Sequence, residues 1–335
     1  MKRLKQPSPL QPGDEIAFVA PSFGVASEPY ATRFAASLKN LTKEGFRAHV
    51  YPNVYKDEGV AGSASPALRG EEINEAFSSE AKAIFSVGGG ETMIEILPYV
   101  DFASIKKGKP KLFMGYSDNT NLTFTLNILC DMVSVYGPHG PSFYARPFRC
   151  SEKDALRLLK GETHFEGYPK YSITHSDPAH PLYRYRLTQE KLITPIGYVG
   201  PMRGTLLGGC LDCLLSLCGT RFDKVKEFNR AHPEGIIWFL EACDLNAIAI
   251  RRGLLQLKEA GWFSNAKGFL VGRPLHGEEV FGTSPLSSFT DLLGELGLPI
   301  LYNVDLGHIP PALPLLSGAY CEASLIEGNL VIDYL

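Results

Sequence analysis

The first half of the chain alternates short apolar segments with amphipathic ones, and this alternation restricts the possible folds strongly. In the amphipathic segment 30–44, Phe34, Leu38 and Leu41 recur at helical spacing, and Gly45 follows as a stop signal. Short buried strands that alternate with helices are typical of a parallel sheet covered by helices on its faces. We therefore predict an N-terminal α/β domain. Its expected strands are residues 15–20, 46–51, 83–87, 112–115 and 132–136, and its expected helices are residues 30–44, 68–77 and 92–99.

The composition changes between about Ser142 and Pro195, where Tyr, Pro, His and Arg dominate and apolar periodicity is poor. Loops of this length are usually functional or disordered, and the aromatic content favours an ordered one that covers something. We interpret this stretch as an irregular linker or flap that could contain a hairpin. The resulting division is an N-terminal domain over 1–165, a linker or flap over 166–195, and a C-terminal domain over 196–335.

The second half again mixes strand-like and helix-like segments. The apolar run GIIWFLE is typical of a buried strand that ends in a carboxylate. The expected strands of the C-terminal domain are residues 196–207, 235–241, 266–271 and 299–304, and its expected helices are residues 211–218 and 247–260.

The overall composition is that of an ordinary globular protein and excludes several function classes. The 335 residues are 44% hydrophobic and 21% charged, and 33 basic against 36 acidic residues give a net charge of −3. Such a balance does not indicate nucleic-acid binding. No apolar run approaches the ~20 residues that span a bilayer, and the short basic start is followed by Gln6 and Pro7 rather than by the apolar core of a signal peptide. We expect a cytoplasmic protein with no membrane or nucleic-acid partner.

Seven cysteines, an odd number scattered through apolar surroundings, argue against a disulfide framework. Cys210 and Cys213 form a CxxC pair, but Leu and Cys recur at helical spacing around it, which favours small core residues. No second CxxC and no nearby His pair completes a zinc site. We therefore predict no metal and no cofactor, and a dithiol redox role for the pair is the alternative.

Three polar residues follow predicted strands directly: Ser117 after LFMG, Glu241 at the end of IIWFL, and His308 after ILYNV. The carboxyl ends of parallel strands are where sites gather in such sheets. A nucleophile, an imidazole base and an orienting carboxylate are what acyl transfer requires. Each residue also has a plainer interpretation. Ser117 could cap the following helix, Glu241 could pair with Arg251 or Arg252, and His308 could be a hydrogen-bonded loop residue.

The Gly88-Gly89-Gly90 turn also follows a predicted strand. It lacks the spacing and the lysine of a P-loop. Its backbone N–H groups, together with that of Asp118, could instead face a developing oxyanion. A plain tight turn that needs positive φ remains the alternative.

Several segments in order give the chain a resemblance to a known family. They are Ala20-Pro21-Ser22, VGGGETMIEILPYVDF, KLFMGYSDNTNL, GPHG, GTLLGGCLDCLLSLCGT, IIWFLEACD, VGRP and NVDLGHIPPALPLLSG, which together span roughly residues 14 to 320. This set resembles the LD-carboxypeptidase family of serine peptidases, which includes the microcin C immunity peptidases. The chain departs from the family pattern at Gly90, where an aromatic or polar residue is common, and at Cys210, where Asn is usual.

The resemblance implies roles for the residues singled out above. Ser117 would be the nucleophile, Glu241 the orienting carboxylate and His308 the general base. The backbone N–H groups of Asp118 and of Gly89 or Gly90 would form the oxyanion hole. It also implies an N-terminal α/β domain that holds the serine, a C-terminal domain rich in β structure that supplies Glu and His, a site between the domains, and a homodimer without metal.

The implied function is a serine carboxypeptidase that cleaves an amide near a free carboxylate. Candidate substrates are a murein tetrapeptide and a peptidyl-aminoacyl nucleotide, and the alternative is a non-catalytic member that binds a peptide or nucleotide. Immunity members place a tryptophan in the flap to stack a nucleobase, whereas Trp238 and Trp262 lie outside the flap here. The residues that could stack instead are Tyr168, Tyr171, Tyr183 and Tyr185, and those that could bind a substrate carboxylate are Arg146, Arg184, Arg186 and Arg203.

Overall fold

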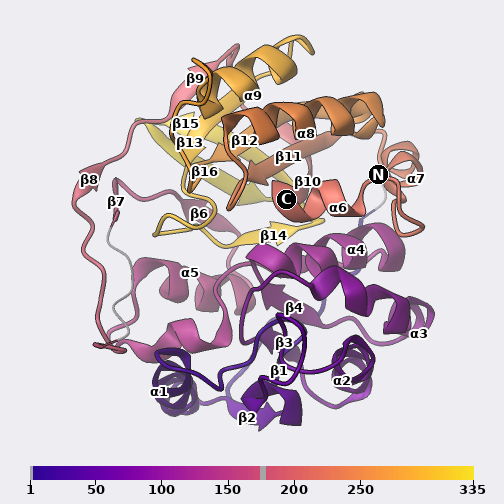
Figure 1. Cartoon of the computed structure of the whole chain (residues 1–335), viewed down its shortest axis with the longest axis vertical. Coiled ribbons are helices and arrows are strands. Elements are labelled where there is room, and N and C mark those ends of the chain that lie inside the picture. The colour runs from indigo at the N-terminus through magenta and orange to yellow at the C-terminus, as the bar shows by residue number, and fades with distance from the viewer. Residues whose placement is uncertain (1–2, 174–178) are drawn as a thin grey trace.

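A computed structural model of the chain describes residues 3–173 and 179–335 (Figure 1). Two sheets lie one above the other in this view, and helices surround each of them. The fold class predicted from the sequence, a parallel-sheet α/β domain followed by a β-rich α/β domain, is confirmed. Among the described helices, none combines the length and the apolar character that a membrane crossing requires.

The first sheet has six strands in the order β14-β5-β4-β3-β1-β2. Strands β1 to β5 run parallel, as the alternation of short apolar and amphipathic segments predicts. The strands are β1 (Glu15–Val19), β2 (Arg47–Val50), β3 (Ala83–Ser86), β4 (Leu112–Gly115) and β5 (Ser134–Tyr136). The accompanying helices are α1 (Tyr30–Lys43), α2 (Pro66–Ser78), α3 (Phe102–Lys107) and α4 (Thr120–Cys130), with 3₁₀ turns η1 (Pro52–Tyr55), η2 (Met93–Tyr99) and η3 (Ser117–Asn119).

The second sheet has eight strands in the order β6-β16-β15-β10-β11-β12-β13-β9. Its four central strands are parallel and its outer strands are antiparallel. The strands are β6 (His164–Glu166), β9 (Thr194–Ile196), β10 (Met202–Cys210), β11 (Ile236–Glu241), β12 (Ala266–Gly272), β13 (Ile300–Val304), β15 (Tyr320–Ile326) and β16 (Asn329–Tyr334). Its helices are α6 (Leu211–Leu217), α7 (Val225–Ala231), α8 (Ala247–Glu259) and α9 (Pro285–Gly294), with the 3₁₀ turn η5 (Trp262–Asn265).

The stretch expected to be irregular after Ser142 is partly helical. A 3₁₀ turn, η4 (Gly140–Tyr144), is followed by α5 (Cys150–Leu159), whose Ala155, Leu156 and Leu159 are buried. The apolar face of α5 is short and lies between segments rich in Pro, Tyr and Arg, so the composition of the stretch concealed it. Farther along, β7 (Lys170–Tyr171) pairs with β8 (Gln189–Glu190) as a small antiparallel ladder.

The two halves of the chain exchange strands. Strand β6 pairs with β16 in the second sheet, and β14 (Leu315–Ser317) pairs with β5 in the first. The division at residues 165 and 195 stays a prediction, since each sheet takes one strand from the other side of it.

Helix α4 and strand β10 hold the two sheets together by a close backbone approach. The Cys210 N–H donates to Thr120 Oγ1 at 2.9 Å. Gly209 has φ +151°, and a Cβ there would lie 2.4 Å from Thr120 Cγ2. Because any side chain would collide with α4, the glycine is required for this contact.

A buried ionic cluster attaches the flap to the loop that follows β13. Asp305 accepts hydrogen bonds from Lys191 Nζ at 2.5 Å and from Arg273 Nη2 at 2.9 Å. It also accepts the Tyr168 N–H at 2.7 Å. The Lys191 side chain is 1% exposed and that of Asp305 is fully buried. Lys191 and Tyr168 belong to the predicted linker or flap, so one carboxylate holds both of its ends near the second sheet.

We predict that Asp305→Asn lowers the free energy of unfolding by about 3–5 kcal/mol, because two buried cations lose their counter-charge. Urea denaturation measures the change. Glu322→Gln is the matched control, since Glu322 pairs with a largely exposed Arg203, where water screens the ion pair, and its loss should change the stability much less. Equal losses in the two variants would contradict the importance of the buried cluster.

Candidate active site

Ser117 occupies the tight turn between β4 and α4, as predicted. Its backbone has φ +63°, in the left-handed region that non-glycine residues enter only at a cost of roughly 1–3 kcal/mol. Its hydroxyl hydrogen-bonds to His308 rather than to a backbone N–H of η3 or α4. The Ser117 hydroxyl faces a large pocket between the two sheets. The strained turn therefore presents the hydroxyl outward, where a substrate can reach it.

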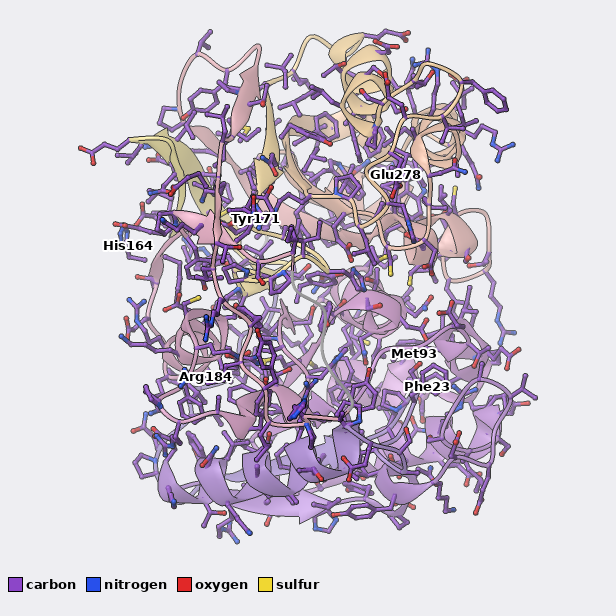
Figure 2. The ribbon with its side chains drawn as sticks, turned by 60° about the vertical axis from the view of Figure 1, so that its left-hand side comes forward. Phe23, Met93, His164, Tyr171, Arg184 and Glu278 are labelled. Atoms are coloured by element: carbon purple, nitrogen blue, oxygen red, sulfur yellow. The ribbon has the colours of Figure 1, made fainter. Side chains whose placement is uncertain are left out.

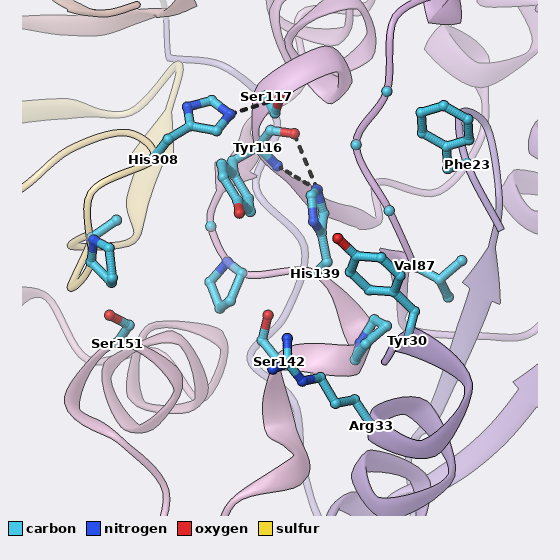
Figure 3. A pocket seen from close by; sticks show the side chains of 18 of the residues that line it. Phe23, Tyr30, Arg33, Val87, Tyr116, Ser117, His139, Ser142, Ser151 and His308 are labelled. Carbon is cyan, nitrogen blue, oxygen red and sulfur yellow. Dashed lines mark hydrogen bonds between the residues drawn. The ribbon is translucent and has the colours of Figure 1, made fainter. Parts of the chain in front are cut away.

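The structure brings Ser117, Glu241 and His308 together. His308 Nε2 lies 2.9 Å from Ser117 Oγ (Figure 3), and His308 Nδ1 lies 3.0 Å from Glu241 Oε2. Glu241 ends β11, and His308 lies on the loop after β13. Gly307 has φ +100°, and a Cβ there would lie 2.8 Å from Glu241 Oε2, so a glycine lets the histidine loop reach the carboxylate. The alternative partner Arg251 pairs with Asp291 instead.

The charges of Glu241 and His308 stabilise each other inside the protein. Burial raises the pKa of Glu241, but the charge of His308 and the hydrogen bonds to the carboxylate outweigh it and hold that pKa below its ordinary value. Burial likewise lowers the pKa of His308, yet the Glu241 carboxylate raises it well above the ordinary histidine value. Glu241 is therefore ionised at neutral pH, and it favours a proton on the imidazole.

Tyr136, at the end of β5, connects the serine to the carboxylate. Its hydroxyl donates to Glu241 Oε1 at 2.6 Å and accepts the Ser117 N–H at 3.1 Å. The sequence predicts the strand that carries Tyr136 but not this role. Its position directly before the GPHG segment was the available signal, and nothing in the sequence showed that its hydroxyl reaches residues of both sheets.

The Asp118 carboxylate points away from the pocket and fixes the neighbouring loops. Its Oδ2 accepts hydrogen bonds from Ser22 Oγ at 2.6 Å and from the Met93 N–H at 2.9 Å. Its Oδ1 accepts from Asn121 Nδ2 at 2.9 Å. Burial raises the pKa of Asp118, and these donors oppose the rise. Asp118 thus holds the loop after β1 and the start of η2 beside the serine turn.

The glycine turn lies against Ser117. A Cβ on Gly89 would lie 3.3 Å from Ser117 Oγ and would crowd the serine, whereas a Cβ on Gly90, which has φ +158°, would lie 2.2 Å from Ser22 Oγ and would collide with it. Within the described part of the chain, the backbone N–H groups of Gly89 and Gly90 donate no hydrogen bond. Gly89 and Gly90 line the pocket, whereas Asp118, which follows the serine, is not among its lining residues. Their participation in an oxyanion hole stays a prediction.

The pocket that contains Ser117 and His308 has a volume of about 910 Å³. Its walls are rich in aromatic side chains, and Tyr183 and Tyr185 of the flap are among them. The other two tyrosines proposed for stacking lie elsewhere. Tyr168 donates its hydroxyl to Asp154, and Arg273 lies over the ring of Tyr171.

The arginines that we proposed from the sequence as carboxylate ligands do not line this pocket. Arg146 pairs with Glu44, Arg203 pairs with Glu322, and Arg184, labelled in Figure 2, donates to backbone carbonyls of residues 146 and 147. The basic residues that do line it are Arg33, Lys56 and Arg149. All three lie in the N-terminal domain, and two of them, Arg33 and Lys56, are far in sequence from the flap, so proximity to the flap in sequence was a poor guide to the pocket's cations.

Two family models match the chain. The LD-carboxypeptidase N-terminal domain matches residues 16–137, and the LD-carboxypeptidase C-terminal domain matches residues 203–323. The chain belongs to the LD-carboxypeptidase family. The first model contains the Ser117 turn, and the second contains Glu241 and His308. Each model thus matches the residues that one of the two sheets contributes to the site.

The chain is similar over nearly its whole length to proteins of known name. It is 26% identical to the "Probable murein peptide carboxypeptidase" of Bacillus subtilis, across 98% of this chain and 94% of that protein. It is 24% identical to the "Microcin C7 self-immunity protein MccF" of Escherichia coli, across 97% and 94%.

Solved structures share the fold. MccF in complex with glutamyl sulfamoyl guanosine aligns with a TM-score of 0.83 at 22% identity, covering 100% of this chain and 99% of that one. The muramoyltetrapeptide carboxypeptidase from Oxalobacter formigenes aligns with a TM-score of 0.72 at 22% identity, covering 96% and 98%.

We predict that Tyr136→Phe lowers the free energy of unfolding by roughly 1–3 kcal/mol, because Glu241 loses a donor and the Ser117 N–H loses its acceptor. The same change should raise the pKa of His308 further, since the carboxylate loses the tyrosine donor and its charge then acts more strongly on the imidazole. Urea denaturation and a histidine NMR titration measure the two effects. Tyr302→Phe is the control, because the Tyr302 hydroxyl makes no hydrogen bond within the described residues. An unchanged His308 titration in Tyr136→Phe would contradict the connecting role.

Proposed function

We propose that the protein is a serine carboxypeptidase that hydrolyses an amide near a free carboxylate, with Ser117 as nucleophile, His308 as general base and Glu241 as the orienting carboxylate. The observation that carries this proposal is the unbroken hydrogen-bond chain from Ser117 Oγ through both ring nitrogens of His308 to Glu241. The family membership supports it, because carboxypeptidases give the family its name.

The geometry supports an acyl-enzyme route. His308 Nε2 takes the proton of Ser117 Oγ as the oxygen attacks the substrate carbonyl, and it then returns that proton to the leaving amine. Glu241 holds the imidazole through Nδ1 and stabilises the imidazolium that forms. The backbone N–H groups of Asp118 and of Gly89 or Gly90 would receive the oxyanion. Water then attacks the ester with His308 again as base, which releases the acid and restores the serine.

Two substrate classes follow from the relatives. One is a murein tetrapeptide that ends in D-Ala, and the other is a peptidyl-aminoacyl nucleotide, as MccF in the solved complexes holds glutamyl sulfamoyl guanosine. Tyr183 and Tyr185 supply aromatic faces in the pocket that could stack on a nucleobase. A homodimer and a cytoplasmic location remain expectations from the sequence.

We predict that Ser117→Ala abolishes hydrolysis without lowering stability, because the alanine keeps the strained turn and removes only the nucleophile. The measurement is product release from the tetrapeptide and from a peptidyl-aminoacyl adenylate analogue, each with wild type and variant. Release of D-Ala by wild type alone indicates a murein peptidase, and cleavage of the adenylate alone indicates a detoxifying enzyme. Turnover by Ser117→Ala at the wild-type rate would refute the nucleophile. A serine-directed phosphonate that fails to label the wild type would favour the non-catalytic alternative.

The pH dependence of kcat/KM tests the base. His308 must be neutral to take the serine proton, and its pKa lies above the ordinary value. Activity should therefore rise with pH through a limb above pH ~6.5. Glu241→Gln removes the charge that raises this pKa while burial, which lowers it, remains. We predict that this variant moves the limb to lower pH and reduces kcat by roughly 10³- to 10⁴-fold. A limb that stays in place would exclude His308 as the titrating base.

A further inference from the structure

Arg33, on α1, lines the pocket in a fixed orientation. Its guanidinium carbon lies 5.0 Å from the centre of the Tyr144 ring, and its Nε donates to the Pro181 carbonyl at 2.5 Å. These contacts hold the guanidinium plane without using its two terminal nitrogens. Among the residues that the structure describes, those nitrogens make no hydrogen bond and no ion pair. Arg33 therefore brings to the pocket wall a positive charge that no described residue neutralises through an ion pair.

The neighbouring Arg149 shows the contrast. Its guanidinium packs 4.8 Å from the centre of the same Tyr144 ring. It pairs with both carboxylate oxygens of Glu152, at 2.6 and 2.9 Å, and donates to Tyr144 Oη at 3.1 Å and to the Ser142 carbonyl at 3.0 Å. Every nitrogen of Arg149 is thus in use and its charge is neutralised. Arg33 is the guanidinium of this wall that keeps donors available for a ligand.

A second polar group of the same pocket has no ordinary hydrogen-bond partner. Ser151, in the first turn of α5, is 6% exposed, and its hydroxyl interacts weakly with the Tyr185 side chain but makes no hydrogen bond of ordinary geometry within the described chain. It lines the pocket, and Figure 3 shows it on the same side of the pocket as Arg33 and Ser142. A buried hydroxyl without a partner is unfavourable unless something supplies one. A bound ligand that reaches Arg33 could satisfy it.

We infer that Arg33 binds an anionic group of the substrate, a carboxylate or a phosphate, that lies away from the scissile bond. A preoriented guanidinium with two free terminal nitrogens matches such a group by paired, charge-assisted hydrogen bonds. Figure 3 shows Arg33 across the pocket from Ser117, with the rings of Tyr116 and His139 between them in that view. The substrate therefore carries its anion on a part that extends past these two rings.

The rings between Ser117 and Arg33 would accommodate an uncharged part of the ligand rather than a second charged group. Tyr116 and His139 stack with centroids 4.3 Å apart, and burial lowers the pKa of His139 to about 4, so its imidazole is neutral. This middle section is uncharged at neutral pH. A ligand with an amide at Ser117, an uncharged middle and an anion at Arg33 fits the pocket. The inference rests on the proposed function only in taking this pocket as the substrate site.

Binding to the Ser117→Ala protein tests the inference without turnover. Two pairs of probes differ only in the anion: adenosine 5′-monophosphate against adenosine, and two tetrapeptides ending in D-Ala with Glu or Gln at the second position. Isothermal titration should show that the charged member of at least one pair binds about 10- to 100-fold more tightly. A preference in the nucleoside pair indicates a phosphate, and one in the peptide pair indicates a carboxylate.

Substitutions at Arg33 test whether this residue causes the preference for the charged probe. Arg33→Ala and Arg33→Gln, the second of which keeps part of the stem over Tyr144, should reduce the ratio of affinities to about one. Arg33→Lys should keep part of it, because the charge remains and the paired geometry is lost. Arg184→Ala, outside the pocket, is the control and should leave the ratio unchanged.

Three results would overturn the inference: equal affinities within both pairs, no binding of any probe, or a preference that survives Arg33→Ala and Arg33→Gln. Hydrolysis by the protein with Ser117 intact is scored separately. A charge preference that depends on Arg33 in a protein without hydrolytic activity would uphold the anion site and reject the proposed peptidase function. Hydrolysis without such a preference would support the peptidase function and reject the anion site at Arg33.

Discussion

The burial of the Glu241 carboxylate is the constraint on which the rest of the site depends. A carboxylate in a dry interior is costly unless opposite charge and hydrogen-bond donors surround it. Here the donors come from both sheets: Tyr136 ends a strand of the first, and His308 follows a strand of the second. Separation of the two sheets would take the Tyr136 hydroxyl away from Glu241 and Ser117 away from His308, so the same cluster favours domain docking and positions the imidazole beside Ser117.

Close backbone contacts allow the residues of the two sheets to approach each other at the site. Gly209 allows β10 to reach α4, and Gly307 allows the histidine loop to reach Glu241, each at a place where a Cβ would collide. On the other side of the serine turn, the Asp118 carboxylate holds Ser22 and the Met93 N–H. The nucleophile is therefore supported from both sides of its turn. Such support fixes the geometry of a site more accurately than loops alone can.

The sequence predicts the parts of this structure whose signals are local. Apolar runs located the central strands, and the residues that follow them located Ser117, Glu241 and His308 at strand ends. Helix α5 was missed because its apolar face is short. Tyr136 and Arg33 were missed for a different reason, since each acts on residues distant in sequence and neither has a distinctive local pattern. The roles of Gly89 and Gly90 also depend on which backbone N–H groups remain free, and periodicity carries no such information.

The flap connects the reactive and the anion-binding ends of the pocket. Its middle is held by the first domain, because Arg33 Nε donates to the Pro181 carbonyl and Tyr144 Oη donates to the Tyr183 carbonyl at 2.5 Å. Both of its ends are held by the second domain, where Asp305 accepts from the Tyr168 N–H and from Lys191 Nζ. A ligand anion on the terminal nitrogens of Arg33 would fix the guanidinium that also holds Pro181. Recognition at that end and order in the flap are thus coupled through one side chain, while the hydrogen-bond chain at Ser117 is anchored independently by Glu241.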